Sequence, residues 1–307
     1  MSERVVIKRL TVIGVGLIGG SFARALRAAG TVEHIIGCGR NRKNLEKALE
    51  LGVIDEYSLD IKQAVIDADM VFIATPVGSF KSVLTQLKGS LKQGAILTDG
   101  GSTKCSVIKA AESVFDELPV NFVPGHPIAG TENSGVESSF ATLYQDHRTI
   151  LTPLHYTNSE AIDIVSRLWK SAGAQVVLME PQHHDQVLAA TSHLPHLLAF
   201  SLVNTLTTLD EKQEIFDNAA GGFSDFTRIA SSDPSMWQDI CLANKQALLE
   251  HLDHFTRDLN KLRTALEQSD GDFLKQIFIR AKQSRDDFVE KSEIERTESE
   301  KKPNYDK

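Results

Sequence analysis

The chain has 307 residues, of which 41% are hydrophobic and 24% are charged, and its formal net charge is −8. This length suits about two domains with sizeable cores, and the ordinary composition excludes a fibrous, collagen-like or wholly disordered protein. The acidic balance argues against nucleic acid as a partner, since that requires a broad basic surface.

The first half of the chain alternates between short β-branched runs, which predict buried strands, and amphipathic stretches, which predict helices. This alternation predicts an α/β fold with a doubly wound, mostly parallel sheet covered on both faces. Two later strand-like pieces, 149–152 and 175–178, flank a helix at 159–171 and are expected to extend the same sheet. The other expected strands are 9–13, 34–38, 70–75, 95–98 and 120–123, with helices at 21–29, 42–51, 80–91 and 104–118.

Beyond residue 179 the periodicity is helical only, interrupted by Pro195, Gly221-Gly222 and Pro234. This pattern predicts an all-helical C-terminal domain. Near the end the chain has almost no apolar residues, which predicts a disordered tail. The expected organisation is therefore a dinucleotide-binding domain over 1–179, a helical domain over 180–290 and a tail over 291–307.

A glycine motif at the end of the first strand gives the dinucleotide-binding assignment. Gly14-Val15-Gly16-Leu17-Ile18-Gly19 lies between a strand and a helix, as in Rossmann-like domains. Gly14 permits the tight turn, Gly16 lets the backbone approach a pyrophosphate, and Gly19 allows close packing of helix on strand. The alternative is a purely structural turn. We expect NAD or NADP, bound by Gly14, Gly16, Leu17, Ile18, Gly19 and Thr75.

The end of the second strand bears on the choice between the two cofactors. NAD sites usually carry an acidic residue about 20 residues after the glycines, but here the strand ends Cys38-Gly39-Arg40-Asn41-Arg42. Without that carboxylate a 2′-phosphate is not repelled, and Arg40 or Arg42 could pair with it. Equally, both arginines could be solvated residues at a helix start. The preference stays open, with Gly39-Arg40 leaning towards tolerance of NADP.

Two turns follow later strands at the edge where ligands of such sheets bind. In Asp99-Gly100-Gly101-Ser102-Thr103-Lys104, Ser102 is a candidate for the site or simply a helix N-cap. In the loop at 125–132, His126 stands between glycines and a proline. A neutral imidazole can accept a hydroxyl proton as hydride leaves the same carbon. The alternative for His126 is a loop histidine without chemistry.

The helical part offers further polar candidates. Asp185, Ala189, Ser192 and His196 share one helix face, and His183, His184 and His193 are close in sequence. This histidine-rich segment lacks a zinc-ligand spacing, and we expect no metal. Arg228 follows a Gly-Gly pair and can bind a carboxylate through two hydrogen bonds. An ordinary surface salt bridge is the alternative.

Taken together, several strings resemble the prephenate/arogenate (cyclohexadienyl) dehydrogenases. The resemblance runs in order from about Arg9 to the 280s, and the strings at 125–132 and 192–196 are the specific ones. It implies NAD(P)-dependent oxidative decarboxylation of prephenate, or of its amino analogue arogenate, in tyrosine biosynthesis. The strings are Gly14–Gly20, G-S-x-K at 101–104, G-H-P-I-A-G-T-E at 125–132, S-H-L-P-H at 192–196, D-F-T-R-I-A at 225–230 and S-D-P-x-M-W at 232–237.

The same resemblance implies roles for individual residues. His126 would be the catalytic histidine on the substrate hydroxyl, and Ser102 would help to hold both. Arg228 would bind a substrate carboxylate, with His196, Ser192 and Thr131 lining the pocket and Glu132 near its mouth. The family also implies a homodimer built largely through the helical domain.

Two other functions fit parts of the sequence. A 3-hydroxyacid-type dehydrogenase has the same layout but uses a lysine in its helical domain, where this chain has histidines. A non-catalytic NAD(P)-sensing protein would have no need for His126, His196 and Arg228 together.

The cysteines and the hydropathy pattern bear on location. Cys38, Cys105 and Cys241 lie far apart, which fits free thiols in a reducing compartment. The apolar opening at 5–20 is interrupted by two basic residues, unlike a signal peptide, and no later apolar run approaches the ~20 residues of a membrane span. We expect a cytoplasmic protein with a small-molecule substrate and no membrane partner.

Overall fold

The computed structural model describes residues 6–301. The chain divides into two compact units, Met1–Leu248 and Leu249–Lys307. The first unit holds the whole α/β part and the helices that follow it as far as the start of α12. This division falls well after the boundary expected at 179/180, which stays a prediction.

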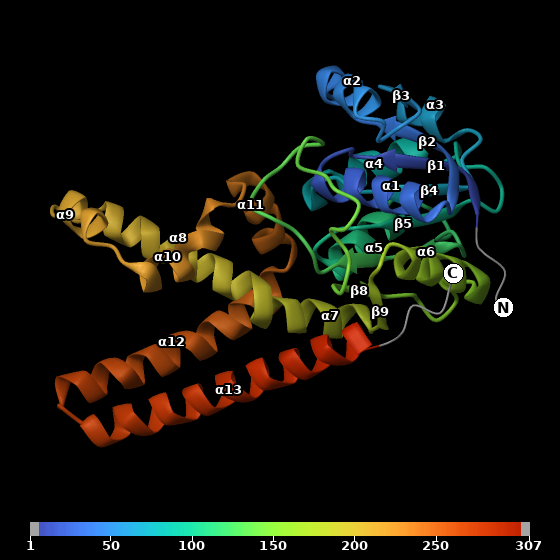
Figure 1. The fold of residues 1–307 in the computed structure, drawn as a ribbon. Coiled ribbons are helices and arrows are strands. Elements are labelled where there is room, and N and C mark those ends of the chain that lie inside the picture. The colour runs from blue at the N-terminus through green and yellow to red at the C-terminus, as the bar shows by residue number, and fades with distance from the viewer. Residues whose placement is uncertain (1–5, 302–307) are drawn as a thin grey trace. The chain divides into compact units, whose positions relative to one another are not determined.

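The first unit is built on a six-stranded sheet in which every pairing is parallel (Figure 1). The strand order is β3-β2-β1-β4-β5-β6, so the winding direction reverses between β1 and β4. Ligands of doubly wound sheets bind at such a reversal, at the carboxyl ends of the strands. The strands are β1 (Ile7–Ile13), β2 (Val32–Cys38), β3 (Glu56–Ser58), β4 (Met70–Ile73), β5 (Ile96–Asp99) and β6 (Phe122–Val123).

Helices cover both faces of this sheet, as expected for strands that are buried on both sides. Apolar residues of α1, α2 and α6 pack on one face, and those of α3, α4 and α5 on the other. The helices are α1 (Leu17–Ala29), α2 (Arg42–Glu50), α3 (Ile61–Val65), α4 (Phe80–Leu87), α5 (Lys104–Glu112) and α6 (Ser159–Ser171), with a 3₁₀ turn η1 (Val77–Ser79) before α4.

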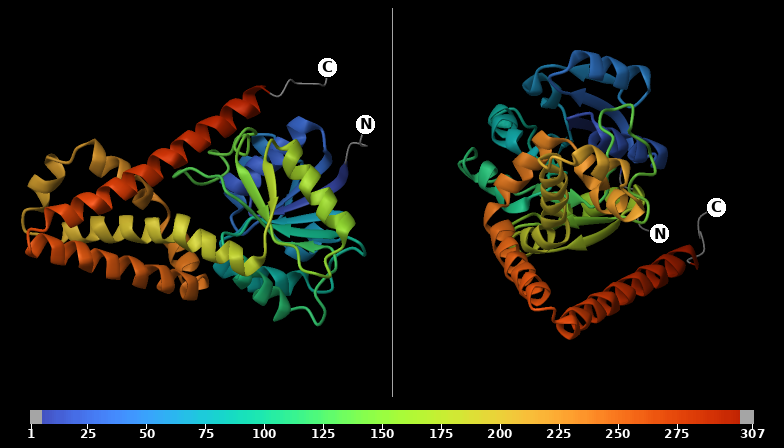
Figure 2. Two further views of the ribbon diagram at one scale, coloured as in Figure 1. Left: turned by 90° about the horizontal axis from the view of Figure 1, so that it is seen from below. Right: turned by 90° about the vertical axis from the view of Figure 1, so that its left-hand side faces the viewer.

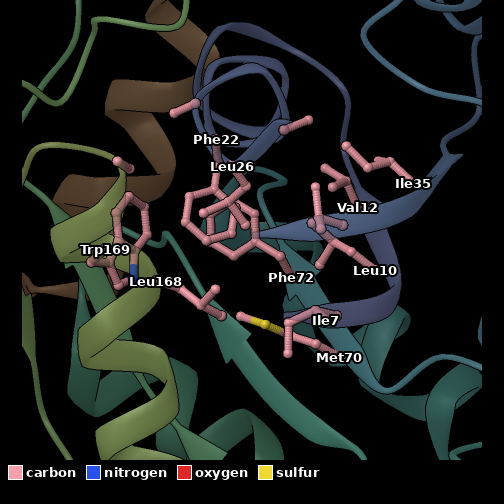
Figure 3. Packing of buried hydrophobic residues seen from close by; sticks show 14 of the residues in the cluster. Ile7, Leu10, Val12, Phe22, Leu26, Ile35, Met70, Phe72, Leu168 and Trp169 are labelled. Atoms are coloured by element: carbon pink, nitrogen blue, oxygen red, sulfur yellow. The ribbon is translucent and has the colours of Figure 1, made fainter. Parts of the chain in front are cut away.

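An aromatic cluster fills the core between α1, β4 and α6 (Figure 3). The ring centroid of Phe22 lies 4.5 Å from that of Phe72 and 4.3 Å from that of Trp169. All three side chains are fully buried. Large rings packed in tilted geometry fix the helices tightly on the sheet, which gives the strand ends a rigid base.

A second, smaller sheet contains β7 (Gly125–Pro127), β8 (Arg148–Leu151) and β9 (Gln175–Leu178). Strand β7 pairs antiparallel with β8, and β9 pairs parallel with β8. Figure 2 shows the yellow-green strands of this sheet beside the teal strands of the main one. The expectation that 149–152 and 175–178 extend the main sheet is therefore wrong. His126 also lies on a strand, opposite Ile150, and not on the predicted loop.

From residue 181 onward, the described chain contains helices and no strand, which confirms the all-helical C-terminal part. Helix α7 (Pro181–Leu188) continues through a π-helical segment, η2 (Ala189–His193), into α8 (Leu194–Thr207) (Figure 1). The remaining elements of the first unit are α9 (Lys212–Asp217), α10 (Gly221–Thr227), the 3₁₀ turn η3 (Arg228–Ser231) and α11 (Pro234–Ala243).

The continuous helix over Pro181–Thr207 has 27 residues and is apolar enough to cross a membrane by length and composition, contrary to the expectation that no later apolar run approaches the length of a membrane span. Its first half carries His184, Asp185 and His193, all buried. These polar side chains bond to the α/β part and to the end of α11, as described below. The segment is therefore a structural helix of the first unit, although most of α8 lies incompletely buried.

The second unit consists of most of α12 (Lys245–Glu267) and of α13 (Gly271–Lys301). Helix α13 includes residues 291–301, so the disordered tail predicted from residue 291 is wrong for that stretch. The rest of the predicted tail, 302–307, lies outside the described residues.

Candidate active site

The glycine turn has the geometry that a dinucleotide requires. Gly14 has φ +97°, and a Cβ there would meet the Ala74 carbonyl oxygen at 2.6 Å. A Cβ on Gly19 would meet the Gly14 carbonyl oxygen at 2.2 Å, so helix and turn need glycine to pack this closely. At Gly16, in contrast, an added Cβ would meet nothing within 4 Å, which leaves the backbone open to a ligand.

The N-terminus of α1 is free to receive a pyrophosphate. Its N-cap is Gly16, which supplies no side-chain cap, and its first turn contains no acidic residue. Leu17 and Ile18 are the first two residues of this helix. Uncapped helix N–H groups and the positive end of the helix dipole favour a phosphate here, so the residues present fit NAD or NADP.

The two arginines after β2 differ in their surroundings. The guanidinium of Arg42 donates to the Tyr57 hydroxyl at 3.2 Å. Arg40 is exposed and makes no hydrogen bond or ion pair with the described part of the chain. Of the two, Arg40 is the cation free to meet a 2′-phosphate. At Gly39 an added Cβ would meet only Leu45, at 3.9 Å, so the missing acid is not excluded by space.

Thr75 follows β4 at the same edge of the sheet and is half-buried. Its hydroxyl accepts a hydrogen bond from Ser79 at 2.9 Å. The intervening Gly78 donates its N–H to a carboxylate oxygen of Asp239, on α11, at 3.2 Å. A loop of the cofactor-binding part is thereby attached to the helical part.

A buried ion pair joins the turns that carry Ser102 and His126. Asp99, at the end of β5, accepts the N–H groups of Gly101 at 2.7 Å and of Gly125 at 3.1 Å. The ammonium of Lys104 binds both the Asp99 carboxylate and the Gly125 carbonyl. Asp99 and Lys104 are both 0% exposed.

Ser102 and His126 each directly follow a glycine that donates to Asp99. This shared carboxylate brings the two candidate residues to the same edge of the sheet. The N-cap of α5 is Thr103, so Ser102 is not the cap that the alternative interpretation expected. Ser102 is half-buried.

His126 is held as a neutral imidazole. Burial is the largest cause that holds its pKa well below the usual value, followed by the nearby His184 and Lys104. The Nδ1 atom of His126 lies 2.9 Å from Nε2 of His184, on α7. A neutral ring at the carboxyl edge of the sheet is suited to accept a proton.

The helical part contributes an aromatic wall. The ring of His196 stacks on Trp237, with centroids 3.6 Å apart and an interplanar angle of 19°. Nδ1 of His196 donates to the Ser192 carbonyl at 2.8 Å, which leaves Nε2 for another partner. The ring of His193 lies edge-on to Trp237, with centroids 6.2 Å apart. The π-helical segment supplies both Ser192 and His193, and such segments occur often at functional sites.

Arg228 begins η3 and is close enough to lower the pKa of His196, although burial is the larger cause. Its guanidinium lies 3.8 Å from a carboxylate oxygen of Glu132, and the two side chains are 65% and 47% exposed. The adjacent Thr131 is exposed, and its hydroxyl accepts the N–H of Asn133 at 3.3 Å. The structure thus brings Arg228, Glu132 and His196 together.

Electrostatic range and ring contacts relate the two sets of candidates. His193 is near enough to His126 to help lower its pKa, and both His193 and His196 contact Trp237. Arg228 is near enough to His196 to lower the pKa of that ring.

The sequence predicted no role in the site for Trp237, and it indicated His184 and Asp185 only as members of a histidine-rich helical segment without a role of their own. The signal available for the pair was a run of polar residues, 182–186, at the start of a helix that is otherwise largely apolar, and for the tryptophan it was its place in the D-P-x-M-W string.

Comparison with known proteins identifies the family. A family model described as "Prephenate dehydrogenase, nucleotide-binding domain" matches residues 22–178, and one described as "Prephenate dehydrogenase, dimerization domain" matches 180–280. The chain belongs to the prephenate dehydrogenase family. The expected resemblance to this family is therefore confirmed.

Individual relatives of the family agree over most of the chain. The cyclohexadienyl dehydrogenase of Zymomonas mobilis is 42% identical over 91% of this chain and 96% of its own, and the prephenate dehydrogenase of Bacillus subtilis is 39% identical over 89% and 74%. The crystal structure of Aquifex aeolicus prephenate dehydrogenase with hydroxyphenyl propionate and NAD+ matches with a TM-score of 0.81, 36% identity and coverage of 96% of this chain and 99% of that one. Synechocystis arogenate dehydrogenase matches with a TM-score of 0.76, 28% identity and coverage of 91% and 99%.

Proposed function

We propose that the protein is an NAD(P)-dependent dehydrogenase that converts prephenate to 4-hydroxyphenylpyruvate by oxidative decarboxylation. The observation that carries this proposal is the half-buried, neutral His126 at the carboxyl edge of the sheet, within electrostatic range of His193, which lies beside Trp237 and His196. The cation Arg228 is in turn within electrostatic range of His196. Family membership supports the reaction class, and a relative solved with hydroxyphenyl propionate and NAD+ supports the ligand class.

Binding of the substrate would depend on its two carboxylates. Arg228 can hold one of them through two parallel hydrogen bonds once it leaves Glu132. The Nε2 atom of His196 and the hydroxyls of Ser192 and Thr131 are the neutral polar groups proposed to line the pocket. These contacts would fix the substrate ring so that its hydroxyl faces His126. Because the reacting groups are then already aligned, the entropic part of the activation barrier is lower than in the uncatalysed reaction.

His126 would act on the ring hydroxyl, with Ser102 holding the same oxygen. The nicotinamide, when bound at the glycine turn, accepts hydride from the carbon that bears this hydroxyl. His126 takes the hydroxyl proton as the C=O bond forms. Loss of carbon dioxide then returns the electron pair of the broken C–C bond to the ring, and the proton returns from His126 to the oxygen of the new phenol. Protons and charge balance over these steps, so the reaction needs no acid from the protein other than the protonated His126.

We propose that the enzyme accepts NADP as well as NAD. Support comes from the free guanidinium of Arg40 and the absence of a carboxylate at Gly39. Arg40→Ala should raise KM for NADP and leave KM for NAD nearly unchanged. Gly39→Asp fits sterically and should disfavour NADP by repulsion of its 2′-phosphate. Equal effects of Arg40→Ala on both cofactors would mean that Arg40 does not contact the 2′ position.

The experiment that tests the function is a steady-state assay of both substrates, prephenate and arogenate, with each cofactor. We expect turnover of prephenate, with release of carbon dioxide in a one-to-one ratio to reduced cofactor. Turnover of arogenate alone would change the substrate assignment. No reduction of either cofactor with either substrate would overturn the proposed function.

We further propose that the protein is a cytoplasmic homodimer formed through the helical part. The family model over 180–280 is a dimerization domain, and in α8 only Ala199 is fully buried although the helix is largely apolar. A second copy would cover that face. The three unpaired cysteines support a reducing compartment. Light scattering during gel filtration should give twice the mass of the chain, and the mass of a single chain would contradict the dimer.

A further inference from the structure

A chain of hydrogen bonds leads from His126 away from the pocket. Nδ1 of His126 lies 2.9 Å from Nε2 of His184, and Nδ1 of His184 lies 2.8 Å from Oδ1 of Asp185. His184 is 0% exposed and Asp185 is 4% exposed. The comparisons and the sequence motifs assign neither residue a function, so the reason for two buried polar groups behind the imidazole has to come from the geometry.

Asp185, at the far end of this hydrogen-bond chain, acts only as an acceptor. Oδ1 of Asp185 also accepts the N–H of Lys104 at 2.8 Å, and Oδ2 accepts the N–H of Cys105 at 2.9 Å. Both amides begin helix α5, where N–H groups have no partner within the helix. Burial raises the pKa of Asp185, but the hydrogen bonds from His184 and these amides outweigh it and lower the pKa below the usual value. Asp185 is therefore ionised and accepts every bond it makes.

This polarity determines the tautomer of both rings. Because Asp185 only accepts, Nδ1 of His184 must carry a proton and donate it. Burial lowers the pKa of His184, so the ring is neutral and its Nε2 is an acceptor. Nδ1 of His126 must then be the donor in the bond between the rings. The one remaining nitrogen of the neutral His126, Nε2, is left with a free lone pair.

We propose that His184 and Asp185 are positioning residues that hold His126 in the tautomer whose Nε2 can accept the substrate hydroxyl proton. This inference rests on the proposed function for its kinetic consequence, but not for the tautomer itself. When His126 takes the proton, its Nδ1–H stays bonded to His184, and the negative charge of Asp185 stabilises the imidazolium through that ring. No proton has to reach the carboxylate, as in the Ser-His-Asp arrangement.

The groups packed around the hydrogen-bond chain of His126, His184 and Asp185 are compatible with the assigned donors and acceptors. The ammonium of Lys104 is bound to the Asp99 carboxylate and the Gly125 carbonyl, and neither bond takes an Asp185 oxygen away from His184. Asn244, which caps the C-terminus of α11, donates from Nδ2 to the backbone carbonyl of Asp185 at 2.7 Å and lies 3.1 Å from Nδ1 of His193. These contacts hold α7 in place through backbone and neighbouring groups. The two carboxylate oxygens of Asp185 are therefore left to accept from the amides of α5 and from His184.

The first test is made on the free wild-type enzyme and needs no substrate. Nitrogen-15 NMR of labelled histidines at neutral to alkaline pH should report His126 as the Nδ1–H tautomer, assigned by loss of its signals in His126→Asn. A proton on Nε2 of His126 would overturn the inference. The measurement remains decisive even if the enzyme fails to oxidise prephenate, an outcome that would overturn only the proposed function.

The second test compares three variants of α7. His184→Phe keeps a ring of similar size but gives Nδ1–H of His126 no acceptor, and should lower kcat about 10- to 100-fold with KM values within about 3-fold. His184→Gln keeps an oxygen acceptor and should recover part of that loss. His183→Gln is the matched control, because His183 is exposed on the same helix.

The three results separate a positioning role from a structural one. A merely structural role would lower the melting temperature and leave the His126 tautomer and kcat of the folded enzyme unchanged. His184→Phe with kcat within about 3-fold of the His183→Gln control would overturn the inference. Should His184→Phe fail to fold, His184→Gln provides the test. A mixed His126 tautomer together with a reduced kcat in His184→Gln would support the positioning role. A mixed tautomer together with a wild-type kcat in the same variant would refute it.

Discussion

At the scale of single residues, the two side chains on which the proposed chemistry depends have very different surroundings. His126 lies among buried polar groups, and burial, His184 and Lys104 all disfavour its charged form. Arg228 is 65% exposed and its carboxylate neighbour, Glu132, is 3.8 Å away. The imidazole is thus fixed before substrate arrives, whereas the guanidinium is free to reorient. We expect the first to act on the rate and the second on binding.

Substitution of His126 by asparagine tests the first role. An asparagine side chain cannot take up a proton, so kcat should fall about 10²- to 10⁴-fold, the range typical of general acid–base groups. KM for the cofactor should change little, because the glycine turn is untouched. Steady-state kinetics with the cofactor varied at saturating prephenate measures both. Full turnover by this variant would remove His126 from the reaction.

Arg228→Ala tests the second role. Loss of the guanidinium should raise KM for prephenate, with a smaller effect on kcat. The lost binding free energy should be about 2–5 kcal/mol if the bound pair is desolvated. We expect a value near the lower end of this range, because Arg228 is exposed in the absence of substrate. Glu132→Gln is the control that removes the resident ion pair but keeps the cation. An unchanged KM in Arg228→Ala would place this residue outside the pocket.

At the scale of elements, the turns after β5 and β6 are held by one ion pair. Asp99 and Lys104 are completely buried, and between them they bind the backbone directly before Ser102 and directly before His126. Two turns from different strands therefore move as one piece, which is what a site assembled from separate loops requires.

Lys104→Met should be strongly destabilising, because it leaves the Asp99 carboxylate buried without its cation. The expected loss is about 3–5 kcal/mol in the free energy of unfolding, measured by urea denaturation. Asp99→Asn with Lys104→Met removes both charges and should be less damaging than Lys104→Met alone. A double variant as unstable as the sum of its two single variants would show that the two charges do not stabilise each other.

The sequence was most informative for elements with regular periodicity. Helix α6 has the bounds predicted, and the five strands of the main sheet other than β3 were placed within a few residues because their β-branched runs are buried. Strand β3 was not predicted, because it has only three residues and none of them is fully buried. Strand β7 was missed since Gly125, His126 and Pro127 have low strand propensity, and only pairing with β8 makes them extended. Nor can periodicity tell which sheet a strand such as β9 joins.

Only part of the candidate site can be predicted from the sequence, because some of its contacts join residues that are far apart along the chain. Strings close in sequence, such as those around Ser102, His126 and Arg228, can be recognised from motifs. The bonds of His184 and Asp185 cross about 60 to 80 residues of sequence, so only the folded chain reveals them. The contact between Trp237 and His196 also depends on the packing of two helices.

At the scale of the whole molecule, burial of several histidines should make folding sensitive to acid. The pKa values of His126, His184, His193 and His196 are all lowered, chiefly by burial, and that of His193 falls to about 4. These rings are neutral when folded but take up protons when unfolded below about pH 6.5. Stability is therefore complete above that pH and is lost as pH falls towards the lowered values.

Urea denaturation at pH 7.5 and pH 5 measures this loss. His193 alone should make the protein about 2 kcal/mol less stable at pH 5, since 1 pKa unit corresponds to about 1.4 kcal/mol. Asp185 contributes little to this difference, because a carboxylate with a lowered folded pKa loses its stabilising effect only as pH falls below the unfolded value of about 3.9 towards the folded one. His193→Gln should reduce the difference, and the exposed His183→Gln should not. Equal stability at both pH values would contradict the prediction.

The π-helical segment Ala189–His193 determines how far the helix rotates between α7 and α8, whatever its residues are. It accommodates more backbone per turn than the α-helices on either side, and each residue of an α-helix advances the rotation by about 100°. If the same residues closed into regular α form without loss of a residue, everything downstream would turn by about that angle. His196 would then rotate off Trp237 while His184 stayed in place. The irregular turn therefore sets the angular phase between the histidine behind the base and the histidine of the aromatic wall.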